Sequence, residues 1–207
     1  MIMFRKLKFL ALLALAASAM CYAQVQSSDE TSGQILGGSL NSPIRIEVFS
    51  DFQCPACRDL YLGTMRQILQ DYSSKDKVCI IYHEYPLPAH KYSRDAARYS
   101  EAASRLGVKQ LLAVMDSLFM DQAKWSQDGK IEPSIAKALS REDFQKLKQI
   151  MLDSSINLAI EREVTLATRV PIKSTPTMII RYTGKQQKVE GLVTYIVLKK
   201  FIDDVIK

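Results

Sequence analysis

The sequence predicts an α/β protein in which an all-helical segment interrupts a β-sheet. Two short apolar runs, at 44–50 and 77–85, have the β-branched and aromatic composition of strands, and a helical pattern at about 56–72 joins them. From about 91 to 169 the chain is rich in Ala, Leu, Met, Lys, Glu, Arg and Gln, which favour helices. A strand pattern then returns before a final amphipathic helix. The predicted order is therefore β-α-β, helical insertion, β-β-α.

The first three elements form a predicted βαβ unit. The connecting segment, Ala56 to Leu69, has apolar residues at helical intervals. Such crossovers are almost always right-handed and join parallel strands. We therefore expect the strands at 44–50 and 77–85 to be parallel.

The insertion at about 91–169 contains apolar stripes at helical spacing, which indicate a packed core rather than a cofactor site. Gly107, Gly129 and Pro133 divide it, and Ser140 to Asp143 resembles a helix-capping sequence. After the insertion, the run from Ser174 to Tyr182 is a predicted strand with a proline near its start. A turn at 183–185, a pairing strand at 187–192 and a helix at 195–206 complete the domain.

The N-terminus has the pattern of a secretory signal peptide, which we place at residues 1–23. Arg5, Lys6 and Lys8 precede an apolar run from Phe9 to Met20, which is shorter than the ~20 residues that span a bilayer. Cleavage after Ala19 or Ala23 fits, and acylation of Cys21 is a minor alternative. The sequence thus predicts export to the periplasm or another extracytoplasmic compartment.

Residues 24–42 are rich in Ser, Gly, Gln and acidic residues, so we expect a flexible leader, with the folded domain at 43–207. Loss of the signal lowers the formal charge from +6 to about +3, which leaves no basic patch to predict nucleic-acid binding. Oligomeric state is not assigned by the sequence.

Cys54 and Cys57, in the sequence Cys-Pro-Ala-Cys, lie between the first strand and its helix. Residues three apart share a helical face, within reach of a disulfide. Pro55 suits the first helical turn, and Cys54 at the helix N-terminus gains the dipole and free N–H groups that favour a thiolate. This context predicts a redox-active pair with Cys54 as the nucleophile and Cys57 as the resolving thiol.

A structural disulfide and a zinc site are the alternatives for this pair. Cys79 and His83 could complete four zinc ligands, but on a strand they stand ~13 Å apart, too far to bind one ion. We therefore predict no metal or other cofactor. Cys79 is the unpaired thiol after export, and its apolar neighbours indicate a buried core residue.

The order of elements, the paired cysteines and the Thr-Pro step resemble the thioredoxin fold with a helical insertion, as in the DsbA-like thiol:disulfide oxidoreductases. Residues 50–57, Ser-Asp-Phe-Gln-Cys-Pro-Ala-Cys, are similar to the branch written S-D-F-x-C-P-x-C. The Tyr-Pro-Leu-Pro step at 85–88 with His90 after it, and the Ser-Thr-Pro-Thr run at 174–177, support the resemblance.

The resemblance implies further site residues. Pro176 corresponds to the family's cis-proline, beside which an extended substrate pairs with the backbone, and Thr175 would contact Cys54 and tune its basicity. Glu47 matches the buried acid that relays the proton of the second cysteine, although strand alternation also allows it to face outward. His83 and His90 are expected to be surface or turn residues.

The resulting hypothesis is an exported dithiol oxidase that introduces disulfides into secreted or periplasmic polypeptides through Cys54 and Cys57. The family implies reduced or unfolded polypeptides as substrates and a membrane redox partner. The alternatives are a disulfide isomerase or reductase, with which Thr175 is compatible, and a module that binds Cu(I) or Zn through the two thiolates.

Overall fold

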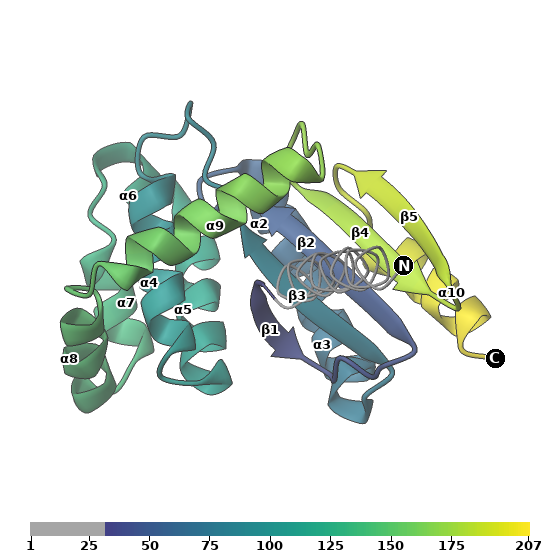
Figure 1. Ribbon diagram of the computed structural model, residues 1–207. Helices are drawn as coiled ribbons and strands as arrows, with labels where there is room; N and C mark the ends of the chain where they lie inside the picture. Colours follow the sequence, from purple (N-terminus) through teal and green to yellow (C-terminus); the bar gives the residue numbers. More distant parts are fainter. Residues whose placement is uncertain (1–31) are drawn as a thin grey trace, which may run out of the picture. The chain divides into compact units, whose positions relative to one another are not determined.

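A five-stranded mixed sheet organises residues 32–207, the part of the chain that the computed structural model describes (Figure 1). The predicted signal peptide and residues 24–31 of the predicted leader lie outside the described residues. The strand order is β1-β3-β2-β4-β5. The strands are β1 (Gln34–Gly37), β2 (Ile44–Ser50), β3 (Val78–Glu84), β4 (Thr177–Tyr182) and β5 (Lys185–Glu190). As predicted, β2 and β3 are parallel, whereas the other neighbouring pairs are antiparallel.

One face of the sheet is covered by the helix that follows β2 and by the C-terminal helix α10 (Tyr195–Val205). The first of these is continuous but changes its winding: α2 (Pro55–Leu60) leads into a π-helical stretch at Tyr61–Met65 and then into α3 (Arg66–Asp71). Buried residues of β2 and β3 that alternate along the strands, such as Val48 and Tyr82, join this main core.

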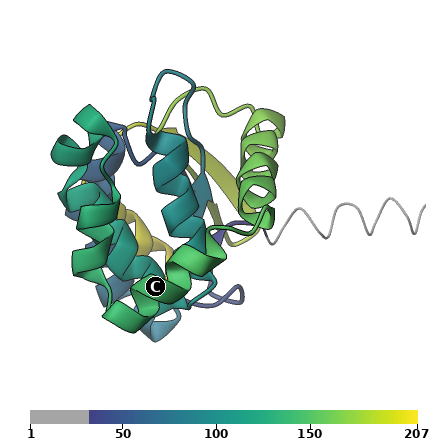
Figure 2. The ribbon, with the colours of Figure 1, turned by 90° about the vertical axis from the view of Figure 1, so that its left-hand side faces the viewer.

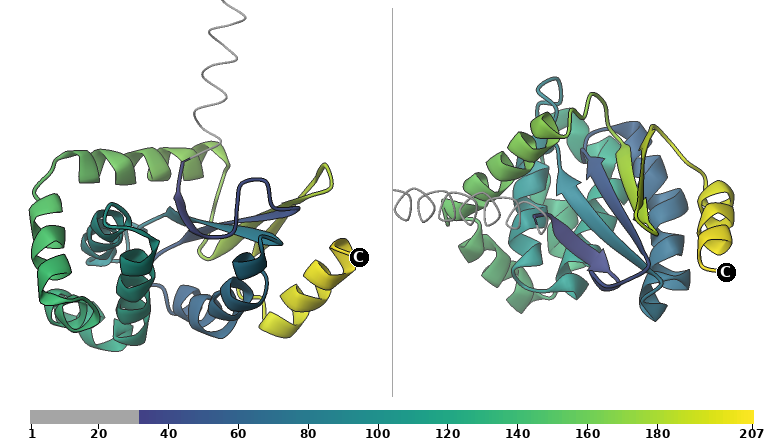
Figure 3. Two further views of the ribbon diagram at one scale, coloured as in Figure 1. Left: turned by 90° about the horizontal axis from the view of Figure 1, so that it is seen from below. Right: turned by 45° about the vertical axis from the view of Figure 1, so that its right-hand side comes forward.

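The opposite face is crossed by α9 (Ser155–Arg169), as the left view of Figure 3 shows. Phe49, Ala167, Ile172 and Ile179 form a second, smaller cluster of buried residues there. The two faces of β2 therefore pack against different helices. Residues of β2 with even numbers face α2 and α3, and those with odd numbers face α9.

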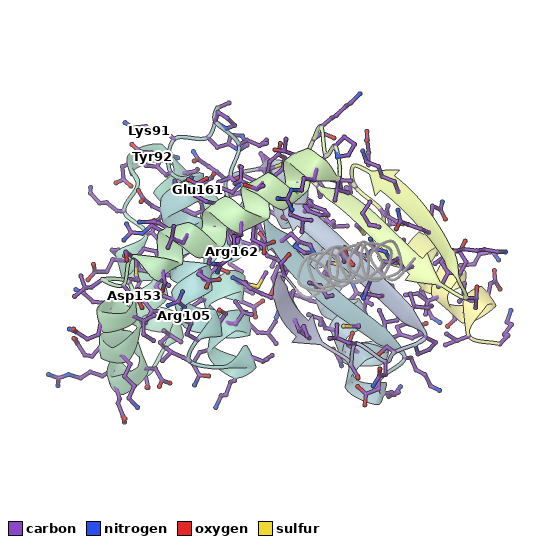
Figure 4. All side chains as sticks on the ribbon, in the orientation of Figure 1. Lys91, Tyr92, Arg105, Asp153, Glu161 and Arg162 are labelled. Atoms are coloured by element: carbon purple, nitrogen blue, oxygen red, sulfur yellow. The ribbon has the colours of Figure 1, made fainter. Side chains whose placement is uncertain are left out.

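The predicted insertion is observed as a run of helices between β3 and β4, which faces the viewer in Figure 2. It consists of α4 (Ser93–Ser104), α5 (Val108–Met120), α6 (Gln122–Asp128), α7 (Glu132–Ala138), α8 (Arg141–Ile150) and α9. The predicted cap is present, because the Asp143 N–H donates to the Ser140 hydroxyl at 3.0 Å. In the connection from α8 to α9, Asp153 pairs at 3.4 Å with Arg105, the C-cap residue of α4 (Figure 4). Arg105 also donates to the Ser155 hydroxyl at 2.8 Å.

β1 corrects the prediction of a flexible leader that extends to residue 42. Gln34–Gly37 adds an edge strand to β3, and the compact unit begins at Gly33. Leu36 is only 2% exposed, and Ser100 donates to the Gln34 side chain at 2.9 Å. Gly38 makes the tight return to β2 possible, because a Cβ there would lie 2.1 Å from the Val78 carbonyl oxygen and its φ is +77°. Burial of Leu36 and the backbone pairing of β1 with β3 thus hold this segment in the domain, although its composition is otherwise that of a linker.

No helix within residues 32–207 has both the length and the apolar character needed to cross a bilayer.

Candidate active site

Cys54 and Cys57 lie where β2 gives way to α2, as predicted. Cys54 is the N-cap residue, with extended φ and ψ of −76° and 121°, and Pro55 opens the helix. Both cysteines carry free thiols and are buried, Cys54 at 8% exposure and Cys57 at 1%. The difference in exposure means that an incoming sulfur meets Cys54 first.

The two thiols have opposite acidities. The hydrogen bond from the Cys57 thiol lowers the pKa of Cys54 to about 5, against the opposing effect of burial. The Thr175 hydroxyl and the backbone N–H groups of Cys57 and Ala56, at the start of α2, contribute to the same lowering. Burial raises the pKa of Cys57 far above its usual value, and the neighbouring Cys54 adds to the effect. In the reduced pair the negative charge therefore resides on Cys54.

The loop before β4 lies against Cys54. The Thr175–Pro176 peptide bond is cis, and the Cys54 Sγ lies 3.5 Å from the Thr175 carbonyl oxygen. After β5, the Gly191 N–H donates to the Pro176 carbonyl oxygen at 2.8 Å. Thr64, on the π-helical stretch, donates its hydroxyl to the Val193 carbonyl oxygen at 2.8 Å. The proline loop, the loop after β5 and the active-site helix are thus bonded to one another.

The helical insertion holds the other side of the dithiol loop. The Gln122 side chain on α6 is buried and donates to the carbonyl oxygens of Phe52 at 2.7 Å and Cys54 at 3.0 Å. Gln53 accepts from the Tyr92 N–H at 2.8 Å and donates to the Ser126 carbonyl oxygen at 3.2 Å. Sequence reasoning did not identify Gln53 or Gln122 as site residues, because their partners are 39 to 73 positions away.

Phe52 fixes the same loop from within the core. Its ring centroid lies 4.8 Å from that of Phe119 on α5 and 5.4 Å from that of Tyr82 on β3. The ring of Tyr61 contacts Phe119 from the active-site helix, with centroids 4.8 Å apart. This aromatic cluster joins the insertion to the sheet directly beneath the cysteines.

Glu47 does not occupy the place expected of a proton relay. Val48 and Ser50 line the small pocket beside Cys57, and strand alternation puts Glu47 on the opposite face of the sheet. There its carboxylate pairs with Arg181, with Arg45 at 3.1 Å and with His83 at 3.7 Å. Burial raises the pKa of Glu47, but the nearby His83 ring and the two arginines outweigh it and lower the pKa. The assignment of Glu47 as the relay is therefore corrected: it belongs to an ionic cluster beneath α9.

The expectations for the two histidines differ in outcome. His83 is 2% exposed rather than at the surface, stacks on Phe49 with ring centroids 4.5 Å apart, and bonds Glu163 of α9 at 2.6 Å. His90 lies in the turn after β3, as expected, and bonds the Asp51 carboxylate at 2.8 Å. Cys79 is fully buried in β3, in agreement with its assignment to the core.

Glu84 is a buried acid that the sequence analysis did not select. It pairs with Ser50 in the parallel ladder, is 2% exposed and lies at the end of β3. Burial raises the pKa of Glu84 well above its usual range, with further upward contributions from the surrounding acids. Within residues 32–207, no three His, Cys, Asp or Glu side chains are arranged so that they could bind a metal ion.

Comparisons with known proteins agree with this architecture. A family model described as Thioredoxin matches residues 30–204. A curated relative from Bacillus cereus, named Probable disulfide bond formation protein D, is 20% identical over 147 residues, which are 69% of this chain and 68% of that protein.

Two solved structures show the same fold. The α-DsbA1 of Wolbachia pipientis is 19% identical with a TM-score of 0.69, covering 84% of this chain and 91% of that one. Oxidised BdbD of Bacillus subtilis is 22% identical with a TM-score of 0.67, covering 84% and 97%. The predicted fold, with its helical insertion, is thereby confirmed.

Proposed function

This chain belongs to the thioredoxin family and has the fold of the DsbA proteins, and on that premise we propose that it is a thiol:disulfide oxidoreductase acting as a dithiol oxidase. The observation that carries the proposal is the opposite acidity of the two thiols, with Cys54 at a pKa of about 5 and the pKa of Cys57 raised. A stable thiolate favours the reduced pair, and a disulfide whose reduced form is stabilised is a strong oxidant.

The proposed reaction starts from the Cys54–Cys57 disulfide. A substrate thiolate attacks the Cys54 sulfur; the disulfide breaks, and its electron pair goes to the Cys57 sulfur, which then takes up a proton. A second substrate thiolate attacks the substrate sulfur of the mixed disulfide. Cys54 leaves as its stable thiolate, and the substrate holds a new disulfide. In the reverse direction Cys57 attacks Cys54 and resolves the mixed disulfide, which is the role predicted from the sequence.

Reduced or unfolded polypeptides are the proposed substrates, docked in extended form against the Thr175–Pro176 loop. Large apolar side chains stand exposed just after Gly191, which bonds this loop: Leu192 at 52%, Ile196 at 77% and Val197 at 61%. We assign them the contact with apolar substrate segments. Export by the predicted signal peptide and reoxidation by a membrane redox partner complete the proposal.

Oxidation of a reduced two-cysteine peptide tests the function. Cys54→Ser should abolish turnover. Cys57→Ser should accumulate mixed disulfides with the peptide, which a reductant cleaves. Full activity of the Cys54→Ser protein would refute the proposed chemistry.

The direction of electron flow needs a separate measurement. The potential against glutathione is expected between about −120 and −270 mV, towards the less negative end for an oxidase. Alkylation of thiols in rapidly quenched cells should find the pair mainly oxidised. A pair found mainly reduced would instead assign the isomerase or reductase alternative.

A further inference from the structure

Asp51, the first residue after β2, has a buried carboxylate held by three donors, one in the dithiol loop and two in the turn after β3. Its Oδ1 accepts from the Gln53 N–H at 2.7 Å, and its Oδ2 accepts from the Leu87 N–H at 2.7 Å. The His90 Nδ1 lies 2.8 Å from the same Oδ2, so that nitrogen carries a proton and donates it to the bond. The Asp51 side chain is 0% exposed and that of His90 is 26% exposed. We call this set of bonds the Asp51 clasp.

The backbone of Asp51 contacts both cysteines. Its N–H donates to the Cys57 Sγ at 3.5 Å, and its carbonyl oxygen accepts from the Cys54 N–H at 3.1 Å. Two groups on one residue therefore fix the relation between the loop and the dithiol. Because the clasp holds the side chain of this residue to the turn after β3, it also limits rotation of the peptide that carries the N–H.

Cys57 is the leaving sulfur when a thiolate attacks Cys54, so a negative charge develops on it during that step. Its surroundings are largely apolar, with Val48 and Leu60 among the lining residues, and it is 1% exposed. The Ser50 hydroxyl is a polar neighbour that, like the Asp51 N–H, lowers the pKa of Cys57 against the effect of burial. A charge that develops where water is excluded depends on donors already in position. The Asp51 N–H is such a donor, and in the structure with free thiols it already points at the sulfur.

We propose that Asp51 is a positioning residue for the leaving sulfur: the clasp by Leu87 and His90 holds the Asp51 N–H on Cys57 while the disulfide is attacked. The inference deepens the proposed oxidoreductase function and rests on it. In the step concerned, a bond forms between the incoming sulfur and Cys54, the Cys54–Cys57 bond breaks, and the electron pair passes to Cys57 beneath the Asp51 N–H. His90 acts only through Asp51.

The test follows attack by dithiothreitol on the oxidised protein in a single turnover. His90→Ala removes one donor of the clasp, whereas His90→Asn can return an N–H near the position of Nδ1. We expect His90→Ala to slow the attack by about tenfold. This is less than the loss of rate on removing a donor to an oxyanion, because His90 acts indirectly. His90→Asn should restore most of the rate. Asp51→Asn, which turns an amide NH₂ towards a donor, should slow it at least as much.

Two controls separate positioning from general damage. Asp203→Asn changes an acid on α10 that accepts at 2.5 Å from Tyr72, the C-cap residue of α3, and should leave the attack rate unchanged. In the reduced variants, the midpoint for alkylation of Cys54 should stay near pH 5, because the groups that lower its pKa are intact. Each variant's thermal unfolding confirms that it is folded.

An attack rate for His90→Ala within twofold of the parent would overturn the inference. So would an equal loss in His90→Asn, or a loss accompanied by an upward shift of the Cys54 midpoint, since both indicate a disordered loop. Failure of the proposed function is a distinct result: the parent protein would then react with dithiothreitol but not oxidise a reduced peptide. If Asp51→Asn does not fold, the two His90 variants decide the question.

Discussion

Cys54 and Cys57 are one helical turn apart, yet only Cys54 ionises readily, because Cys57 donates to it and is itself buried. Above about pH 5 the reduced pair holds one thiolate and one thiol. Reduction then consumes two electrons and one proton. We expect the midpoint potential to fall by about 30 mV per pH unit from pH 6 to 8, and by about 60 mV per unit below pH 5. Equilibration with dithiothreitol at a series of pH values measures this, and a uniform slope of about 60 mV would contradict it.

Thr175 contributes to the same thiolate through its side chain. Its hydroxyl lowers the pKa of Cys54, and valine has the same shape without that hydroxyl. The Thr175 Oγ1 is buried without another hydrogen-bond partner, so its proton is free to turn towards the Cys54 thiolate. Thr175→Val should move the alkylation midpoint of Cys54 upward by roughly one unit, since that donor to the charged form is lost. Thr175→Ser keeps the hydroxyl and should stay close to the parent. If serine and valine shift the midpoint equally, the effect comes from packing and not from the hydrogen bond.

The residues of the dithiol could be predicted because their chemistry depends on neighbours in sequence: a strand, a proline and a helix N-terminus. Glu47 could not be placed, because strand alternation gives two faces without saying which one meets the active-site helix. Asp51 was visible in the motif, but its role depends on Leu87 and His90, which only the folded chain brings to it.

At the scale of elements, the long periodic segments were predictable and β1 was not. The predicted βαβ unit, insertion and final β-β-α are present with boundaries displaced by a few residues. β1 has four residues at the sheet edge, among Gly and Ser, so its local pattern carries little information. Pairing with β3 and a place for Leu36 in the core define it instead.

Adjacent substitutions in β1 test whether it belongs to the folded domain. Leu36 is 2% exposed and lines the pocket beside Cys57, whereas Ile35 is 37% exposed on the other side of the strand. Leu36→Ala should lower the free energy of unfolding by about 2–4 kcal/mol through lost burial and a cavity. Ile35→Ala should cost about 1 kcal/mol or less. Urea unfolding of the oxidised proteins gives both values. Equal small losses would mean that residues 34–37 belong to a flexible leader and not to the folded domain.

At the scale of the whole molecule, α9 is tied to one face of the sheet by a largely buried ionic cluster that includes Glu47, His83, Arg181 and Glu163 of α9. Burial lowers the pKa of His83, but its hydrogen bond with Glu163 and its ion pair with Glu47 outweigh this and raise it. A raised histidine pKa stabilises the fold fully below the unfolded value of about 6.5, and this contribution is lost as pH rises through the folded value. The lowered pKa of Glu47 stabilises above about pH 4.5 and loses its effect as pH falls through the folded value.

The cluster should therefore contribute most between about pH 4.5 and 6.5, and Glu163→Gln tests this. At pH 5.5 the substitution leaves a buried imidazolium without its nearest carboxylate, at a cost on the order of 3 kcal/mol. At pH 9 the imidazole is closer to neutral, so the loss should be smaller.

Glu161→Gln is the control. Glu161 lies two positions earlier on α9 (Figure 4), and its substitution removes only an exposed pair with Arg94, so it should cost about 1 kcal/mol or less at both pH values. Urea unfolding of the oxidised proteins, in which Cys54 does not titrate, gives the comparison. A loss for Glu163→Gln that is the same at both pH values would mean that His83 does not carry the charge, and that Glu163 holds α9 to the sheet through a bond to a neutral imidazole.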